Sequence, residues 1–240
     1  MPIIAMWSGP RNISTAIMRS FENRPDTFIT DEPFYAYYLY KTKEDHPMKE
    51  EIINHGEISW DMVVKHITGD IPNNKSIWYQ KHMVQHCLPG DDIRWTEKLL
   101  NVLLIRNPKE VILSYSKKYV IKNTSQLGYP GQTKLLNTLI ENKGSPPIII
   151  DARDILNNPK RILKLLCIKL DISFLDEMLS WKLGKRKTDG IWGKHWYSNV
   201  ENSTEFMPHT KNNTSIPLKY KKIYEECMEH YQHLYKQRMR

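Results

Sequence analysis

Short apolar segments alternate with helical segments along the chain, which predicts an α/β fold: a three-layer sandwich with a central parallel sheet. The length of 240 residues suits one domain, 1–240, with a sizeable buried core. The apolar segments also end in charged or polar residues. Because right-handed crossovers bring the carboxyl ends of parallel strands to one edge, we expect a ligand site there.

Five strands are predicted in order, each from a short apolar run. They lie near 3–7, 27–30, 76–80, 99–105 and 148–150, and a helix near 14–23 follows the first. Helical or loop additions are expected near 33–75 and 117–147. A last segment near 217–238 has apolar residues at helical spacing, which predicts a C-terminal helix that docks on the domain.

The composition narrows the class of ligand. A net charge of +8, from 35 basic and 27 acidic residues, favours an anionic ligand. The basic residues form no stripe along one helix, so nucleic acid is not an expected partner. No signal or membrane segment is recognisable, and the three cysteines lack metal or redox spacing. We expect a cytoplasmic monomer or homodimer that binds a small molecule, with no membrane and no metal.

The residues that follow the first strand predict an anion-binding loop. Gly9 and Pro10 break the strand, and the helix that begins near Ser14 offers free N–H groups and a positive dipole end. Arg11 adds a fixed charge, and Thr15 a further hydroxyl donor. The usual triphosphate loop reads G-x-x-x-x-G-K-[ST], but here no Lys precedes Ser14. The loop therefore predicts a phosphate-like ligand within a P-loop-NTPase-like topology.

Charged residues also follow the next three predicted strands. Glu32 follows the second strand, Lys81 and His82 the third, and Arg106 the fourth. One such residue is usually a solvated loop charge, but a series of them along one sheet edge favours a shared anion site. After Arg106, the segment 107–110 has an N-cap Asn, an N1 Pro and an N3 Glu, which predicts a second helix N-terminus beside the first.

These segments, in this order, resemble the sulfotransferases that use 3′-phosphoadenosine 5′-phosphosulfate (PAPS). The segment 9–15 resembles the family's 5′-phosphosulfate loop, usually P-K-S-G-T-T, with Arg11 in place of the Lys. The segment 104–115 resembles the 3′-phosphate segment, in which an Arg and a Ser eight residues later hold the phosphate. The segment 186–192 resembles the family's loop R-K-G-x-x-G-x-W, which folds over the 3′-phosphate. The resemblance implies these donor-binding residues: Gly9, Pro10, Arg11, Asn12, Ile13, Ser14, Thr15, Arg106, Ser114, Arg186, Lys187 and Gly190.

The resemblance implies two candidates for the catalytic base. Cytosolic members use the His of a K-T-H element, and Lys81-His82 lies at about the corresponding interval but lacks the Thr. Other branches use a Glu, and Glu32 lies in the string D-E-P-F-Y, which resembles a bacterial branch. We favour Glu32 and keep His82 as its rival, with Arg11 and Lys81 acting near the sulfuryl group.

The implied activity is transfer of a sulfuryl group from PAPS to a hydroxyl or amine of a small-molecule acceptor, without a metal. An alternative is a phosphotransferase that uses ATP and magnesium, for which 148–151, three isoleucines followed by Asp151, is the nearest match to a metal-binding strand. A third possibility is a nucleotide-binding module without catalytic activity.

Overall fold

The computed structural model describes residues 1–210 and 213–240 and confirms the predicted α/β fold. Within these residues, parallel strands form a five-stranded sheet in the order β2-β3-β1-β4-β5. β1 lies at the centre, so its carboxyl end is flanked by those of β3 and β4. The strands span Ile3–Ser8 (β1), Thr27–Asp31 (β2), Ile77–Met83 (β3), Leu100–Ile105 (β4) and Ile148–Asp151 (β5).

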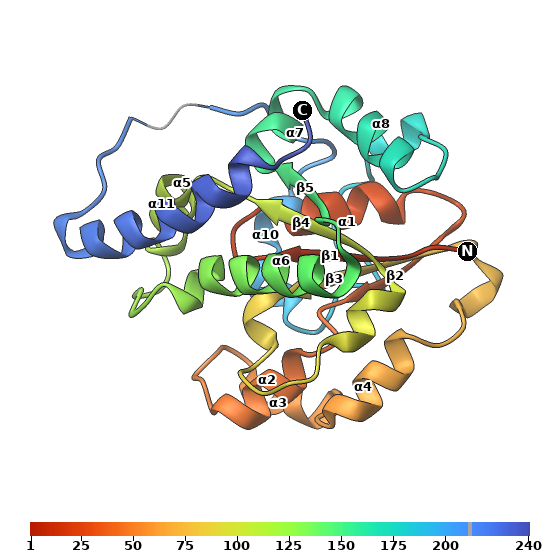
Figure 1. Cartoon of the computed structure of the whole chain (residues 1–240), viewed down its shortest axis with the longest axis horizontal. Coiled ribbons are helices and arrows are strands. Elements are labelled where there is room, and N and C mark those ends of the chain that lie inside the picture. The colour runs from red at the N-terminus through yellow and green to blue at the C-terminus, as the bar shows by residue number, and fades with distance from the viewer. Residues whose placement is uncertain (211–212) are drawn as a thin grey trace.

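Helices cover both faces of the sheet. One face packs against α4 (Trp60–Ile67), α5 (Pro108–Tyr115), α6 (Tyr129–Lys143) and α11 (Lys221–Lys236). The other packs against α1 (Ser14–Glu22), α7 (Ala152–Asn157) and α8 (Pro159–Lys169). Figure 1 shows α6 and α11 side by side over the first face. Because both faces are covered, most residues of the strands are apolar and buried, as is usual for parallel strands.

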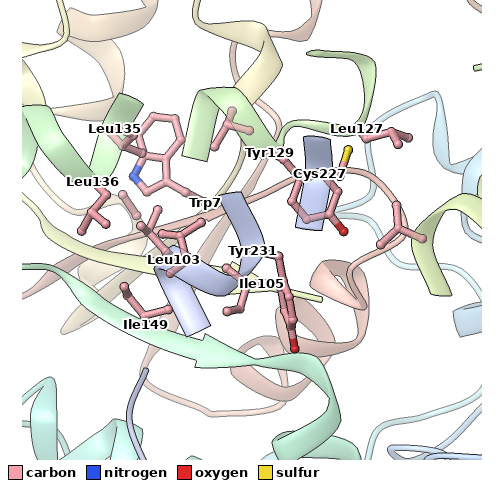
Figure 2. Close-up of a cluster of buried hydrophobic side chains, with 14 of the residues drawn as sticks. Trp7, Leu103, Ile105, Leu127, Tyr129, Leu135, Leu136, Ile149, Cys227 and Tyr231 are labelled. Atoms are coloured by element: carbon pink, nitrogen blue, oxygen red, sulfur yellow. The ribbon is translucent and has the colours of Figure 1, made fainter. Parts of the chain in front are cut away.

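The C-terminal helix completes the first of these cores. Figure 2 shows Trp7 of β1 and Leu103 of β4 among side chains of α6 and α11. Cys227 and Tyr231, both on α11, are buried there, and the Tyr231 hydroxyl donates to Asp151 Oδ2 at 2.9 Å. The helix therefore packs on the sheet along the apolar stripe that its sequence spacing predicts.

Among the described residues, two of the remaining α-helices fall within the addition that the sequence predicts near 33–75, and two lie outside the predicted additions. α2 (Tyr35–Thr42) and α3 (Lys49–His55) pack on each other directly after β2. Two short helices, α9 (Gly193–Trp196) and α10 (Ser198–Glu201), precede the segment that leads to α11. Among the described residues, no helix combines the length and the apolar composition needed to span a bilayer.

Candidate active site

A cavity of about 440 Å³ opens at the carboxyl ends of the central strands. Its volume falls in the range of small-molecule sites, and its position is the one at which open parallel sheets bind ligands. Its walls come from the loop after β1, the ends of β2 and β3, Arg106 and the end of α5, helices α2, α9 and α10, and the segment 203–210. Distant parts of the chain therefore share one site.

The loop between β1 and α1 forms one end of this cavity. Arg11 and Ile13 have positive φ angles of 61° and 60°, which curl the backbone tightly before the helix starts. The Asn12 side chain anchors the loop by donating to the Leu104 carbonyl of β4 at 3.2 Å. No side chain caps α1, so the amides of its first turn remain available to a ligand. This geometry suits an anion.

Two arginines meet at this end of the cavity. Arg11 Nε donates to the Ser114 hydroxyl at 2.9 Å, and Arg106 Nη1 donates to the Arg11 carbonyl at 2.8 Å. Burial, and then the charge of Arg106, lowers the pKa of Arg11. These hydrogen bonds connect the loop 9–15 to Arg106 and Ser114, the two residues that the sequence predicts to hold a 3′-phosphate. Two partly buried cations so close together favour a ligand with more than one negative charge.

Glu110 holds Arg106 from the other side. Its carboxylate accepts from Arg106 Nε at 2.9 Å and lies 2.8 Å from His209 Nε2. Burial alone would raise the pKa of Glu110, but the hydrogen bonds from His209 and Arg106 outweigh burial and lower it. The contact with His209 ties the segment 203–210 to α5 along the cavity wall.

Glu32 stands on the cavity wall and belongs to a buried ion-pair cluster, whose other members are Asp31, Lys81 and Tyr197. Lys81 Nζ donates to Asp31 Oδ1 at 3.0 Å, to the Tyr197 hydroxyl at 2.9 Å and to Glu32 Oε1. Glu32 has a φ of 42°, and its main-chain N–H donates to the Lys81 carbonyl at 2.9 Å. A non-glycine residue in this conformation costs free energy, and such strain gathers at functional sites. The cluster therefore fixes Glu32 at the end of β2.

The cluster carries one net negative charge when its two carboxyl groups and Lys81 are ionised. Burial raises the pKa of Glu32, and the charge of Asp31 raises it further, while Lys81 offsets part of the increase. Burial by itself would lower the pKa of Lys81, but the two carboxylates outweigh it and raise that pKa. The raised pKa gives the Glu32 carboxylate a higher affinity for a proton than an exposed carboxylate has, as a general base requires.

His82 does not reach the cavity, which corrects its candidacy as a base. The sequence predicted that the third strand ends near 80, but β3 continues to Met83, and neighbouring residues of a strand face opposite ways. Lys81 faces the cavity, whereas the His82 ring stacks on Trp7 at 4.4 Å within the core that α6 and α11 cover. Burial, and then the charge of Lys81, lowers the pKa of His82 to about 3. A neutral ring in an apolar core packs and does not take a substrate proton.

The loop 186–190 lies beside the end of α1 rather than at the cavity. Arg186 Nε is 3.7 Å from Glu22 Oε2, Lys187 is exposed, and neither side chain lines the cavity. Gly190 contacts the site only indirectly, since its N–H donates to Asp31 Oδ2 at 3.2 Å. The structure therefore does not bring Arg186 and Lys187 to the other residues that the resemblance implied for the donor.

Tyr197 and Asp31 are two site residues that the sequence did not single out. The Tyr197 hydroxyl donates to Asp31 Oδ2 at 2.6 Å and accepts from Trp192 Nε1 at 3.1 Å. Asp31 was visible as the neighbour of Glu32. Tyr197 lies far along the chain in a segment of short helices, and no motif marks it. Among the described residues, no cluster of three or more His, Cys, Asp or Glu side chains could hold a metal ion.

Comparison with known proteins identifies the family. A family model described as "Sulfotransferase domain" matches residues 1–235. The "Sulfotransferase Domain from the Curacin Biosynthetic Pathway" superposes with a TM-score of 0.54 at 15% identity, covering 97% of this chain and 98% of that chain. A sulfotransferase from Alicyclobacillus acidocaldarius gives a TM-score of 0.58 at 11% identity, covering 100% and 97%. At these identities the two structures show a shared fold.

Two relatives from Arabidopsis thaliana have a different printed name. "Branched-chain-amino-acid aminotransferase-like protein 2" is 33% identical over 231 residues, and protein 1 of the same name is 33% identical over 229 residues. The matches cover 96% and 95% of this chain but 41% of each relative, so the chain spans about two fifths of their length. The aminotransferase in their names is therefore not assigned to this chain. The family match over nearly the whole chain, together with the shared fold, shows that the chain belongs to the sulfotransferase family of enzymes.

Proposed function

We propose that this protein transfers the sulfuryl group of PAPS to a hydroxyl or amine of a small-molecule acceptor. The observation that carries the proposal is the pair of joined anion sites. The loop after β1 suits a 5′-phosphosulfate, and Arg106 with Ser114 supplies a second anion site that contacts Arg11. PAPS has a 3′-phosphate in addition to its 5′-phosphosulfate, whereas ATP carries all its phosphates at one end.

The residues of the loop fit the donor's charged groups. Arg11, the hydroxyls of Ser14 and Thr15, and the amides of the uncapped first turn of α1 would hold the 5′-phosphosulfate. The guanidinium of Arg106 would hold the 3′-phosphate with Ser114. The unfavourable proximity of the two arginines supports this assignment, because an anion between them relieves their repulsion.

The chemistry is an in-line transfer in which one sulfur–oxygen bond forms and one breaks. The acceptor oxygen attacks sulfur, the bond from sulfur to the 5′-phosphate oxygen breaks, and 3′,5′-adenosine bisphosphate leaves. The acceptor proton passes to the Glu32 carboxylate, and Arg11 stabilises the charge that develops on the leaving oxygen. Because Lys81 is already balanced by Asp31, the proton on Glu32 leaves the cluster neutral.

The contacts of Asp151 count against the ATP and magnesium alternative. This carboxylate caps α7 by accepting from the Arg153 N–H at 2.8 Å, and it also accepts from the Tyr231 hydroxyl. Asp151 ends β5, which β4 separates from β1, and it does not line the cavity. The residue that gave the alternative its main support therefore has a structural role.

Ligand binding followed by an acceptor screen tests the proposal. At 100 times its Kd, 3′,5′-adenosine bisphosphate should stabilise the protein by about 2.7 kcal/mol, and ATP with magnesium should stabilise it less. Radiolabelled PAPS incubated with a panel of hydroxyl and amine acceptors should yield a labelled product. Stabilisation by ATP with magnesium alone would overturn the donor assignment. Binding of the bisphosphate without transfer to any acceptor would favour the module without catalytic activity.

A further inference from the structure

The Glu110 carboxylate does not form the helix cap that its place in the sequence predicts. The segment 107–110 matches a capping box, in which an N3 Glu accepts from the N–H of the N-cap residue. The Asn107 side chain does cap α5, because it accepts from the Lys109 N–H at 3.0 Å. Among the described residues, however, no hydrogen bond joins the Glu110 carboxylate to the Asn107 N–H; this carboxylate is paired with Arg106 instead. Glu110 therefore has a role other than capping.

Glu110 stands behind Arg106 as seen from the cavity. Arg106 lines the cavity, whereas Glu110 does not, and only 15% of the Glu110 side chain is exposed. A ligand in the cavity therefore meets the guanidinium and not the carboxylate. Any effect of Glu110 on such a ligand has to pass through Arg106.

The contacts of Arg106 leave part of its guanidinium for a ligand. A guanidinium has five N–H groups. The Nε–H donates to Glu110 Oε2 at 2.9 Å, and one N–H of Nη1 donates to the Arg11 carbonyl at 2.8 Å. Within the described part of the chain these are its two hydrogen-bonded partners, so three N–H groups remain, all on the terminal nitrogens. These are the groups that can hold a phosphate through two of its oxygens.

Glu110 keeps Arg106 beside a second cation. Burial, and then the charge of Arg106, lowers the pKa of Arg11, and the second cause is repulsion between two like charges. Glu110 opposes this repulsion from a fixed position, since its Oε1 lies 2.8 Å from His209 Nε2 and 3.8 Å from Arg153 Nη2. Although burial acts in the other direction, the hydrogen bonds from His209 and Arg106 lower the pKa of Glu110 and keep it ionised. Without Glu110, the flexible Arg106 side chain would be free to swing away from Arg11.

We infer that Glu110 is a positioning residue for the choice of donor. By holding Arg106 at Nε, it aims the terminal nitrogens at the 3′-phosphate, and so determines the preference for 3′,5′-adenosine bisphosphate over 5′-AMP. This inference rests on the proposed function. The contact with Nε carries the effect, and the negative charge does not, because a negative charge near a phosphate opposes its binding.

Two variants separate the contact from the charge. Glu110→Gln keeps the length of the side chain and an oxygen that accepts from Arg106 Nε, but it has no charge. Glu110→Asp keeps the charge but is one methylene shorter, by about 1.5 Å, so it does not reach Nε. In calorimetry, we expect Glu110→Asp to lower the preference for the bisphosphate over 5′-AMP about tenfold, and Glu110→Gln to lower it less than about threefold. An unchanged affinity for 5′-AMP shows that both variants fold.

A control and a double-mutant cycle test whether Glu110 acts through Arg106. Glu141→Asp is the matched control, because Glu141 is exposed on α6 and does not line the cavity, and it should change neither affinity. In an Arg106→Ala background, Glu110→Asp should change the preference by less than about twofold, because no guanidinium remains to be aimed.

The outcomes separate this inference from the proposed function. If the native protein binds 5′-AMP as tightly as the bisphosphate, the proposed donor is wrong, and the inference falls with it. If the native protein prefers the bisphosphate but Glu110→Asp keeps that preference, the role of Glu110 alone is wrong. The same conclusion follows if Glu110→Gln loses the preference as fully as Glu110→Asp, or if Glu110→Asp lowers it equally with and without Arg106.

Discussion

We expect Asp31 to set the strength of Glu32 as the proposed base, and Asp31→Asn tests this directly. In the native cluster, Lys81 donates to both carboxylates, so neither has the full benefit of its charge. Replacing Asp31 with the neutral amide leaves the ammonium to Glu32 alone. The ionised form of Glu32 then gains stability, and the pKa of Glu32 falls.

The size of the effect follows from the geometry. Asp31 Oδ1 is 3.0 Å from Lys81 Nζ, and Glu32 Oε1 is also hydrogen-bonded to it. The two carboxylate oxygens are therefore at most about 6 Å apart, and unit charges at that distance interact by about 3 kcal/mol at an effective dielectric constant of about 20. Such a change is about a hundredfold in the protonation equilibrium of Glu32. If about half of it reaches the transition state, the plateau rate falls about tenfold.

The assay is the pH dependence of kcat/KM with PAPS and the acceptor that the screen identifies. The acidic limb of this profile reports protonation of the base in the free enzyme, so Asp31→Asn should move it to lower pH while the plateau falls. Tyr197→Phe is the control. It removes no charge, and because the Tyr197 hydroxyl lies 3.4 Å from Glu32 Oε1, its loss should move the limb slightly to higher pH. An acidic limb that stays in place or moves upward in Asp31→Asn would refute the charge argument.

Further predictions concern the donor site and the core. Arg106→Ala should weaken the binding of 3′,5′-adenosine bisphosphate, relative to that of 5′-AMP, by at least tenfold in calorimetry, because only the bisphosphate has a 3′-phosphate. An unchanged ratio of the two affinities would contradict the assignment of Arg106. His82→Ala should lower the free energy of unfolding by about 1–3 kcal/mol, since the stack on Trp7 is lost, but leave the acidic limb in place; a displaced limb would restore His82 as a base. In Gly9→Ala the new Cβ would lie 2.2 Å from the Leu127 carbonyl oxygen, so melting temperature and bisphosphate affinity should both fall. Gly69→Ala, whose Cβ would meet nothing closer than 3.4 Å, should change neither, and equal effects of the two would refute this reading of the loop.

The fold and the anion loop were predictable because their signals are local. Apolar runs separated by helical segments determine a parallel sheet, and β1 at its centre brings the loop 9–15 beside the ends of β3 and β4. Glu32 and Arg106 were predicted to lie at the cavity because each follows a strand whose end is easy to recognise. The prediction for these two residues depends on the topology of the sheet. It therefore still holds if the end of a strand is misplaced by one residue.

Whether Lys81 or His82 faces the cavity was harder to predict, because it depends on a single-residue register. β3 is buried on both faces, so its sequence does not alternate between apolar and polar residues, and nothing local tells which of the two faces the cavity. Tyr197 was not predictable for another reason. Its contact with Asp31 spans 166 positions, and it comes from a segment of short helices with no motif of its own. For the loop 186–190, similarity in sequence did not determine where the loop packs.

The central claim is that this cavity transfers a sulfuryl group with Glu32 as the base. The most direct test is the single-turnover rate of Glu32→Gln with saturating labelled PAPS and the acceptor that the screen identifies. The account predicts a rate lower by about 10²–10⁴ with an unchanged affinity for 3′,5′-adenosine bisphosphate, because Gln keeps the size of the side chain but cannot take the proton. A near-native rate at unchanged nucleotide affinity would contradict the account.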